Sequence, residues 1–149
     1  PIFGLFENME ELQRAVLAAA FEKYSRFIAA EMTKGEYAPY KASGMAYIRF
    51  ARDERELFKL LFMRERSREE QLSASNDDVK PLLQLISKNT GMTEAEAARF
   101  HTEMWLFVHG IATMIATSFL DWSDEDVSRA LTDVYEAMTR RWARKENRK

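Results

Sequence analysis

The sequence predicts an all-α protein, an antiparallel bundle of about six helices. Apolar residues recur at helical spacing along the long segments, and no segment needs to be a strand. Only five Gly and three Pro occur in 149 residues, fewer than a turn-rich sandwich or barrel requires. With 46% hydrophobic and 31% charged residues, a chain of this length can bury one sizeable core.

The first predicted helix covers residues 9 to about 32, where apolar side chains form one continuous face. Asn8 is a good N-cap, and Glu11 lies three residues further on, where its carboxylate can reach back to the cap. Gly35 is the expected C-terminal stop, because glycine adopts the left-handed conformation that ends many helices.

Two short helices are expected next. Pro39 and Ser43 open one that breaks near Asp53, and the other covers about 56–64. The second is apolar almost all round, so we expect it to be deeply buried. Residues 64–78 are polar and predict one long connection.

Three more helices complete the bundle. One has Pro81 in its first turn and ends at Gly91. The next opens on a capping box at Thr93 and continues to about residue 120. The last is capped by Ser123 and runs into a basic tail that suits a helix C-terminus.

Composition argues against several classes of function. The absence of Cys excludes disulfides, thiol catalysis and zinc–thiolate sites. His101 and His109 are eight residues apart on one helix, ~12 Å in rise, which is too far for one metal ion. Since no phosphate loop or nucleophile elbow occurs, we expect no enzyme, no metal and no cofactor.

Partners are also constrained by charge and hydropathy. The net charge is −2 and basic residues concentrate in the last ten positions, so the body of the chain is not expected to bind DNA. Residues 104–120 are apolar but include His, Thr and Ser, and they fall short of the ~20 apolar residues of a membrane span. We therefore expect a cytoplasmic protein with no membrane partner.

The helix over 93–120 carries two different apolar faces when residues are placed 100° apart. One is large and aromatic: His101, Trp105, Val108, Ala112, Ile115 and Phe119. The other has small residues at its centre: Leu106, Gly110, Thr113, Thr117 and Leu120. Histidines on such a face are more often satisfied core or rim residues than ligands, but a polar ring in an aromatic wall also orients small molecules.

We predict a small-molecule pocket where the aromatic face meets the rings of the short helices. Its expected residues are Tyr47, Phe50, Phe62, His101, Trp105 and His109. Because the face carries no Lys or Arg, the ligand should be apolar or aromatic rather than a nucleotide or sugar phosphate. The alternative is a filled core with His101 at its rim, since protein interiors normally pack without large voids.

The small-residue face predicts a homodimer. Small side chains let another helix approach closely, and an antiparallel helix pair can dock on its own copy as a four-helix bundle. The expected interface residues are Leu106, Gly110, Thr113, Thr117, Leu131, Val134 and Met138.

Two regions of the chain resemble the TetR (tetracycline-repressor) family of transcriptional regulators. Near the start, the matching residues are Ile2, Phe3, Phe6, Asn8, Glu11 and Leu12, which are similar to the end of that family's DNA-binding domain. Further on, residues 40–67 and 105–110 resemble the Trp-His-Gly type of TetR regulatory domain.

The resemblance implies that residues 1–8 are the end of a recognition helix and that residues 9–149 form a ligand-binding and dimerisation domain. Phe3, Asn8 and Met9 would then lie near DNA, although Phe3 and Met9 replace a Tyr and a Lys that contact phosphate in the family. Most of the helix-turn-helix is not in the sequence, so operator DNA would be bound only through that missing part.

The resemblance further implies a homodimeric regulator, usually a repressor, that responds to a small effector. A ligand preferring one tilt of the first helix would change the spacing of two DNA-reading heads, which must match half-sites about 34 Å apart. The alternative is a stand-alone helical carrier protein without DNA function. A helix-turn-helix encoded upstream of residue 1 would favour the regulator.

Overall fold

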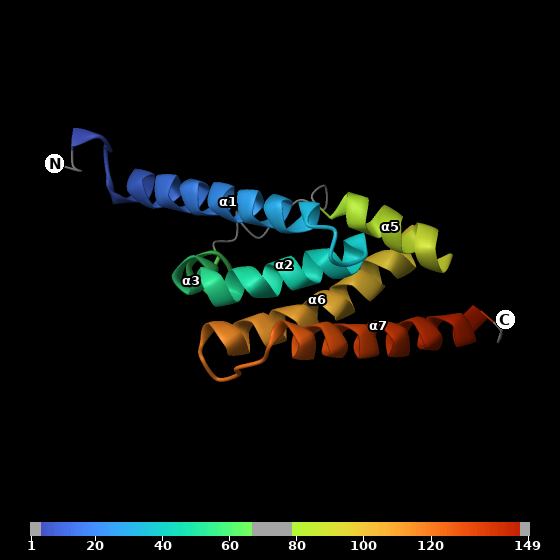
Figure 1. Cartoon of the computed structure of the whole chain (residues 1–149). Helices are drawn as coiled ribbons and strands as arrows, with labels where there is room; N and C mark the ends of the chain where they lie inside the picture. Colours follow the sequence, from blue (N-terminus) through green and yellow to red (C-terminus); the bar gives the residue numbers. More distant parts are fainter. Residues whose placement is uncertain (1–3, 67–78, 147–149) are drawn as a thin grey trace.

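The computed structural model describes residues 4–66 and 79–146, with side chains described up to residue 142. These residues form six helices and no strand, which confirms the predicted all-α class. In the labels of Figure 1 the helices are α1 (Met9–Thr33), α2 (Pro39–Asp53), α3 (Arg55–Phe62), α5 (Lys80–Thr90), α6 (Glu94–Ala116) and α7 (Asp124–Glu146).

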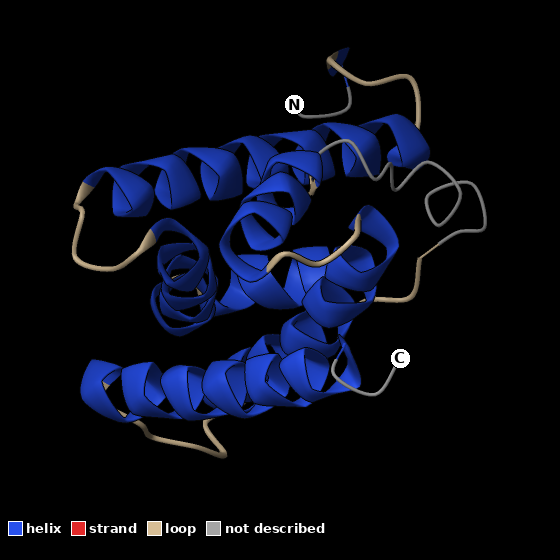
Figure 2. Cartoon of the chain, turned by 90° about the vertical axis from the view of Figure 1, so that its right-hand side faces the viewer, coloured by secondary structure: helices blue, strands red, loops and turns tan. Residues whose placement is uncertain are grey.

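Helix α2 is central to the arrangement and lies between α1 and α6 (Figure 1). It runs parallel to α6, whereas α1 and α7 run in the opposite direction. Helix α5 packs against α6, and the short α3 packs against α1, α2 and α6. The view turned by 90° shows α1 and α7 on opposite sides of the bundle (Figure 2).

The predicted helix starts are confirmed by their caps. The Asn8 side chain accepts from the Glu11 backbone N–H at 2.9 Å, and Thr93 forms a complete capping box with Glu96. The Glu11 carboxylate does not reach back to Asn8 as expected; it accepts from the backbone N–H of Glu7 instead, at 2.6 Å. Ser123 and Asp126 form the same kind of box: the Ser123 hydroxyl accepts from the Asp126 backbone N–H, and the Asp126 carboxylate accepts from the Ser123 backbone N–H.

Helix α6 ends at Ala116, about four residues earlier than predicted. Ser118 adopts a left-handed backbone conformation with φ of 58°, and the N–H groups of Phe119 and Leu120 both bond to the Met114 carbonyl. Helices that end in this conformation usually have Gly or Asn at the left-handed position, so a serine there does not identify the helix end from the sequence. Phe119 is consequently 78% exposed and does not extend the aromatic face.

The core has two parts. The larger joins α1, α2, α3, α6 and α7 around fully buried side chains such as Phe50, Phe58 and Ile48. The smaller lies around Phe100 and Ile86. Helix α3 is less buried than predicted, because Phe58 and Leu61 enter the core while other side chains of the helix reach the surface.

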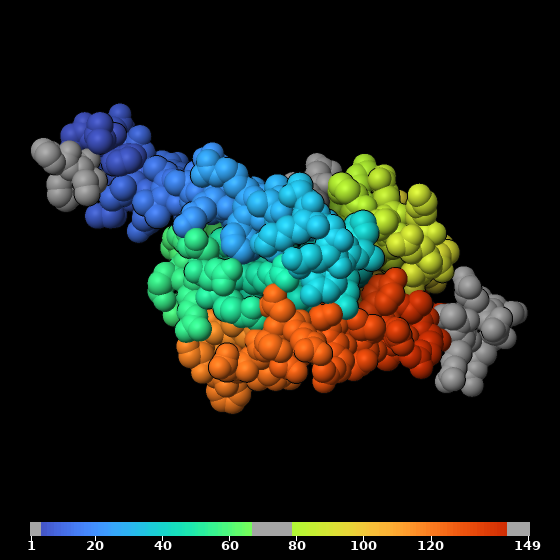
Figure 3. Space-filling view, in the orientation of Figure 1, coloured from blue at the N-terminus to red at the C-terminus, as the bar shows by residue number. Residues whose placement is uncertain are grey.

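The first turns of α1 extend away from the rest of the molecule (Figure 3). Ala20 is its one buried residue, and the side chains before it are exposed or partly exposed. Among the helices of the described ranges, none is both long enough and apolar enough to cross a bilayer.

Candidate ligand cavity

A cavity of about 800 Å³ lies where α1, α2 and α6 meet, with further wall residues from α3, α5 and α7. Its volume is typical of small-molecule sites, which occupy roughly 300–1,000 Å³ and are mostly apolar. The wall is dominated by aromatic and aliphatic side chains.

Helix α1 forms one wall with a stripe of residues at helical spacing, Phe21, Tyr24 and Ile28. The Tyr24 ring meets Phe62 of α3 and Phe50 of α2 edge-on, each with ring centroids 5.1 Å apart. Burial raises the pKa of Tyr24 to about 12, so its phenol is neutral at physiological pH. The aromatic contacts of Tyr24 thus connect α1 to two other helices at the cavity.

The wall between α2 and α6 contains two tyrosine–histidine hydrogen bonds. The Tyr40 hydroxyl lies 3.1 Å from His101 Nδ1, and the Tyr47 hydroxyl lies 2.9 Å from His109 Nδ1. The two helices run in parallel (Figure 1), so Tyr40 and Tyr47, seven residues apart on α2, can each reach one of two histidines that are eight residues apart on α6. Burial lowers the pKa of both histidines, and the nearby Arg66 lowers that of His109 further. Both rings are therefore neutral hydrogen-bonding groups at neutral pH.

Trp105 lies in the cavity wall and is 42% exposed. Its ring stacks on His109 with centroids 4.9 Å apart and planes inclined by 16°. The Tyr47 hydroxyl bonds to Nδ1 of this imidazole, so the ring that stacks on Trp105 is itself held in place.

Four of the six predicted pocket residues line this cavity: Tyr47, Phe62, His101 and Trp105. The other two do not. His109 lies behind Trp105, and Phe50 is fully buried against Tyr24 and Phe27. Phe50 was predicted from its aromatic character, but it points to α1 rather than α6.

The expectation of an apolar or aromatic ligand came from one face of α6, which carries no Lys or Arg, but other helices add charged residues to the cavity wall. Lys41 of α2 lines the cavity. Its Nζ donates to Thr132 Oγ1 at 2.8 Å and lies 5.1 Å from the centre of the Tyr37 ring. Glu136 of α7 also lines the cavity, and its carboxylate pairs with Arg140 at 2.7 Å.

Sequence reasoning missed the walls formed by α1 and α7. The stripe of Phe21, Tyr24 and Ile28 was visible as an apolar face, yet nothing in its pattern separates a cavity wall from a filled core. The same is true of Tyr135 on α7. Only the packing of the helices decides between the two.

The predicted dimer residues separate into three groups by exposure. Leu106, Gly110 and Thr117 are exposed on α6, and a Cβ placed on Gly110 would meet no atom within 4 Å. Thr113, Val134 and Met138 are partly buried. Leu131 is 4% exposed and packs in the core beside Gly44, so its assignment to an interface is corrected to a core role.

Two of the three predicted DNA-proximal residues, Asn8 and Met9, are exposed at the end of α1 that projects from the molecule. Phe3 lies outside the described residues.

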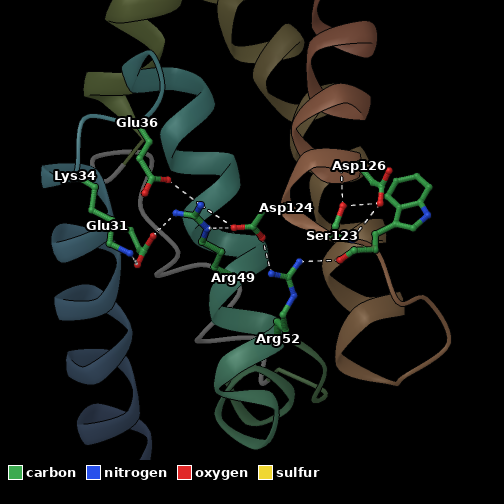
Figure 4. A network of polar contacts seen from close by, with 9 residues as sticks. Glu31, Lys34, Glu36, Arg49, Arg52, Ser123, Asp124 and Asp126 are labelled. Carbon is green, nitrogen blue, oxygen red and sulfur yellow. Dashed lines mark hydrogen bonds and ion pairs between the residues drawn. The ribbon is translucent and has the colours of Figure 1, made fainter.

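At its other end, α1 is fixed by a network around Arg49 of α2 (Figure 4). The guanidinium contacts Glu31 at the end of α1 at 2.6 Å, Glu36 at 2.8 Å and Asp124 at the start of α7 at 2.7 Å. Lys34 pairs with Glu31 as well.

The same network includes Arg52, which pairs with Asp124 and donates to the Trp122 carbonyl at 3.0 Å. Partial burial opposes ionisation of Glu31 and Asp124, but hydrogen bonds from their basic partners prevail and lower the pKa of both. The network therefore holds α1, α2 and α7 together as charged groups at neutral pH.

Among the described side chains, residues 4–66 and 79–142, no three His, Asp or Glu gather in a way that could hold a metal ion. Carboxylates do converge near Arg49, where the guanidinium occupies the space between them.

Comparison with known proteins identifies the family. The profile of the family described as "Tetracyclin repressor-like, C-terminal domain" matches residues 40–141, which is more than half of the chain and includes α2, α6 and most of α7. No curated protein matches the chain significantly. No solved structure does so either. The match covers the residues of both Tyr–His pairs and of the Trp105 stack, and the chain belongs to the tetracycline repressor-like C-terminal domain family.

Proposed function

We propose that this chain is the ligand-sensing and dimerisation part of a transcriptional repressor, and that a small molecule in the cavity releases the repressor from DNA. The observation that carries the proposal is the cavity of about 800 Å³ bounded by α1. Family membership supports a regulatory role rather than a catalytic one.

Helix α1 is the element through which a ligand would act. Its second half forms a cavity wall through Tyr24 and Ile28, and its start includes Glu11 and Leu12, which with the N-cap Asn8 resemble the end of a DNA-binding domain. A ligand that contacts α1 better in one orientation shifts the population toward that orientation.

The ligand-binding proposal is tested by blocking the cavity. Ala29 lines the cavity from the exposed side of α1, so Ala29→Trp should fill part of it without disturbing the core. Its neighbour Ala30 is exposed and does not line the cavity, which makes Ala30→Trp the matched control. Native mass spectrometry of the purified chain should show a co-purifying small molecule with the parent and Ala30→Trp proteins only. Equal retention by the Ala29→Trp variant would place the ligand elsewhere.

We further propose that two copies pair through the exposed face of α6. Leu106 is 59% exposed, Met114 is exposed one turn beyond Gly110, and Thr117 continues the same face. Glycine within a helix costs about 1 kcal/mol relative to alanine, and no contact inside the protomer requires it at position 110. A helix of a second copy that packs closely against position 110 would explain why glycine is present there.

Gly110→Leu tests the interface. Gly110 is exposed and a Cβ placed there meets no atom within 4 Å, so the fold should persist while association is lost. Light scattering coupled to size-exclusion chromatography should show a monomer for this variant and a dimer for the parent. Ala19→Leu adds a side chain to an exposed position of α1 and serves as the control. A dimer that survives Gly110→Leu would move the interface to another face.

A further inference from the structure

We infer that the cavity binds an amphipathic monocarboxylate, with the carboxylate paired to Lys41 and the apolar body against the aromatic walls. The inference rests on the proposed ligand-sensing function and names the chemical class of the effector.

Lys41 is a cation in the cavity wall that makes no ion pair within the described residues. Its Nζ bonds to a neutral hydroxyl, Thr132 Oγ1, and faces the Tyr37 ring. Its side chain is partly buried. Withdrawing a charge from water is unfavourable unless a partner of opposite charge compensates it. A ligand that covers Lys41 therefore gains by bringing an anion.

Among the described residues, no other charged or titratable group that lines the cavity is available to compensate the charge of Lys41. Glu136 already pairs with Arg140, and His101, the histidine that lines the cavity, bonds to Tyr40 and is kept neutral by partial burial. One uncompensated positive charge matches a singly charged carboxylate. A dianionic phosphate would leave an excess negative charge beside Glu136, and a lysine offers one point charge rather than the fork of an arginine.

The rest of the wall fits an apolar body. Away from Lys41, the cavity is bounded by the rings of Tyr24, Phe62 and Trp105 and by the side chains of Ile28 and Val108. Tyr47 is six residues beyond Lys41, or ~9 Å along the axis of α2. A ligand with a carboxylate at one end and a ring system or short alkyl chain at the other spans this distance.

The test compares acids with their neutral amides, which share shape but not charge. Two pairs are used, 1-naphthylacetate with 1-naphthylacetamide and octanoate with octanamide. Their apolar parts differ, one aromatic and one alkyl, so the result does not depend on the shape of a single ligand. Isothermal titration at pH 7.5 measures binding to the full chain. At least one acid should bind about tenfold more tightly than its amide, as expected for one charge-assisted hydrogen bond.

Substitutions assign this preference to Lys41. Lys41→Met keeps the aliphatic stem and removes the charge, so the acid should lose its advantage over the amide. Lys41→Arg should retain it. Lys59→Met is the matched control, because Lys59 pairs with Glu56 on α3 and does not line the cavity.

Each outcome decides the inference. If acid and amide bind equally, or if Lys41→Met leaves the preference intact, the carboxylate assignment is wrong while the ligand-sensing function still stands. If neither acid binds at millimolar concentration, the inference is likewise overturned. The native mass spectra of the Ala29→Trp variant then show separately whether the cavity binds any small molecule.

Discussion

Trp105, His109 and Tyr47 act as one unit, although they come from two helices. Tyr47 bonds to the imidazole, the imidazole stacks on the indole, and the indole faces the cavity. A neutral imidazole suits this position, since it can bond and stack without the cost of a buried charge. The Trp and His of the Trp-His-Gly resemblance thus have a physical role at the cavity wall.

The lowered histidine pKa values predict that the protein becomes less stable in mild acid. Well above pH 6.5, the ordinary pKa of histidine, both histidines are neutral in the folded and unfolded chains. As the pH falls below 6.5, the unfolded chain takes up protons that the folded chain resists, so the free energy of unfolding decreases. Thermal melts between pH 7.5 and 5.5 should show a falling Tm.

The control for this prediction is the double variant His101→Gln and His109→Gln, which should show a flatter profile over the same range. Glu31 and Asp124 do not interfere, because their pKa values are lowered from 4.5 and 3.8 and they titrate below this window. A Tm that stays constant in the parent protein down to pH 5.5 would contradict the assignment of neutral, partly buried histidines.

Tyr47→Phe isolates the hydrogen bond behind Trp105. The ring contacts with Phe58 and Phe62 remain, whereas His109 Nδ1 loses its partner. We expect a loss of about 1 kcal/mol in the free energy of unfolding, measured by urea titration, because one partly buried polar atom becomes unsatisfied. Tyr37→Phe, at a partly exposed ring outside the cavity, should change it little.

At the scale of helices, local sequence signals explain most boundaries. Asn8, Thr93 and Ser123 start helices as their caps predict, and Gly35 and Gly91 take left-handed conformations where stops were expected. These signals depend on a few neighbouring residues, so they can be identified before the fold is known.

The end of α6 depends on longer-range structure and could not be predicted in this way. Ser118 reaches its left-handed conformation where its hydroxyl accepts a hydrogen bond from Arg55, 63 positions away in sequence. The candidate cavity was only partly predictable for the same reason. Phe50 and Tyr47 are both aromatic residues of α2, and only the position of α1 directs one into the core and leaves the other at the cavity.

The capping box of α6 predicts a measurable effect on stability. Thr93→Ala removes the hydroxyl that accepts from the Glu96 N–H, so one backbone donor at the start of the helix loses its partner. The expected cost is about 1 kcal/mol in the free energy of unfolding, measured by urea titration. Thr102→Ala, at an exposed position inside the same helix, is the control and should be close to neutral.

For the molecule as a whole, the Arg49 network joins three helices that the aromatic contacts alone do not connect at that end. Arg49→Met leaves Glu31, Glu36 and Asp124 close together without their shared cation. We expect a loss of about 2 kcal/mol in the free energy of unfolding, less than for a fully buried pair because the site is partly solvated. Hydrogen exchange should accelerate in the last turns of α1.

Arg26→Met is the comparison for that variant. Arg26 pairs with Glu22 on the exposed side of α1, where both side chains are mostly in water. Its removal should leave both stability and exchange nearly unchanged. Similar behaviour of the two variants would mean that the network contributes no more than a surface ion pair.

The Arg49 network lies at one end of α1, so the two functional points of the helix are at very different distances from it. Met9 is 22 residues from Glu31, or ~33 Å along the helix axis, whereas Tyr24 is seven residues, ~10 Å, from the same point. If α1 turns as a rigid rod about its fixed end, a displacement of about 1 Å at Tyr24 becomes about 3 Å at Met9. Under the proposed function, a ligand that displaces the Tyr24 ring by about 1 Å would thus move the start of α1 by about the diameter of an atom.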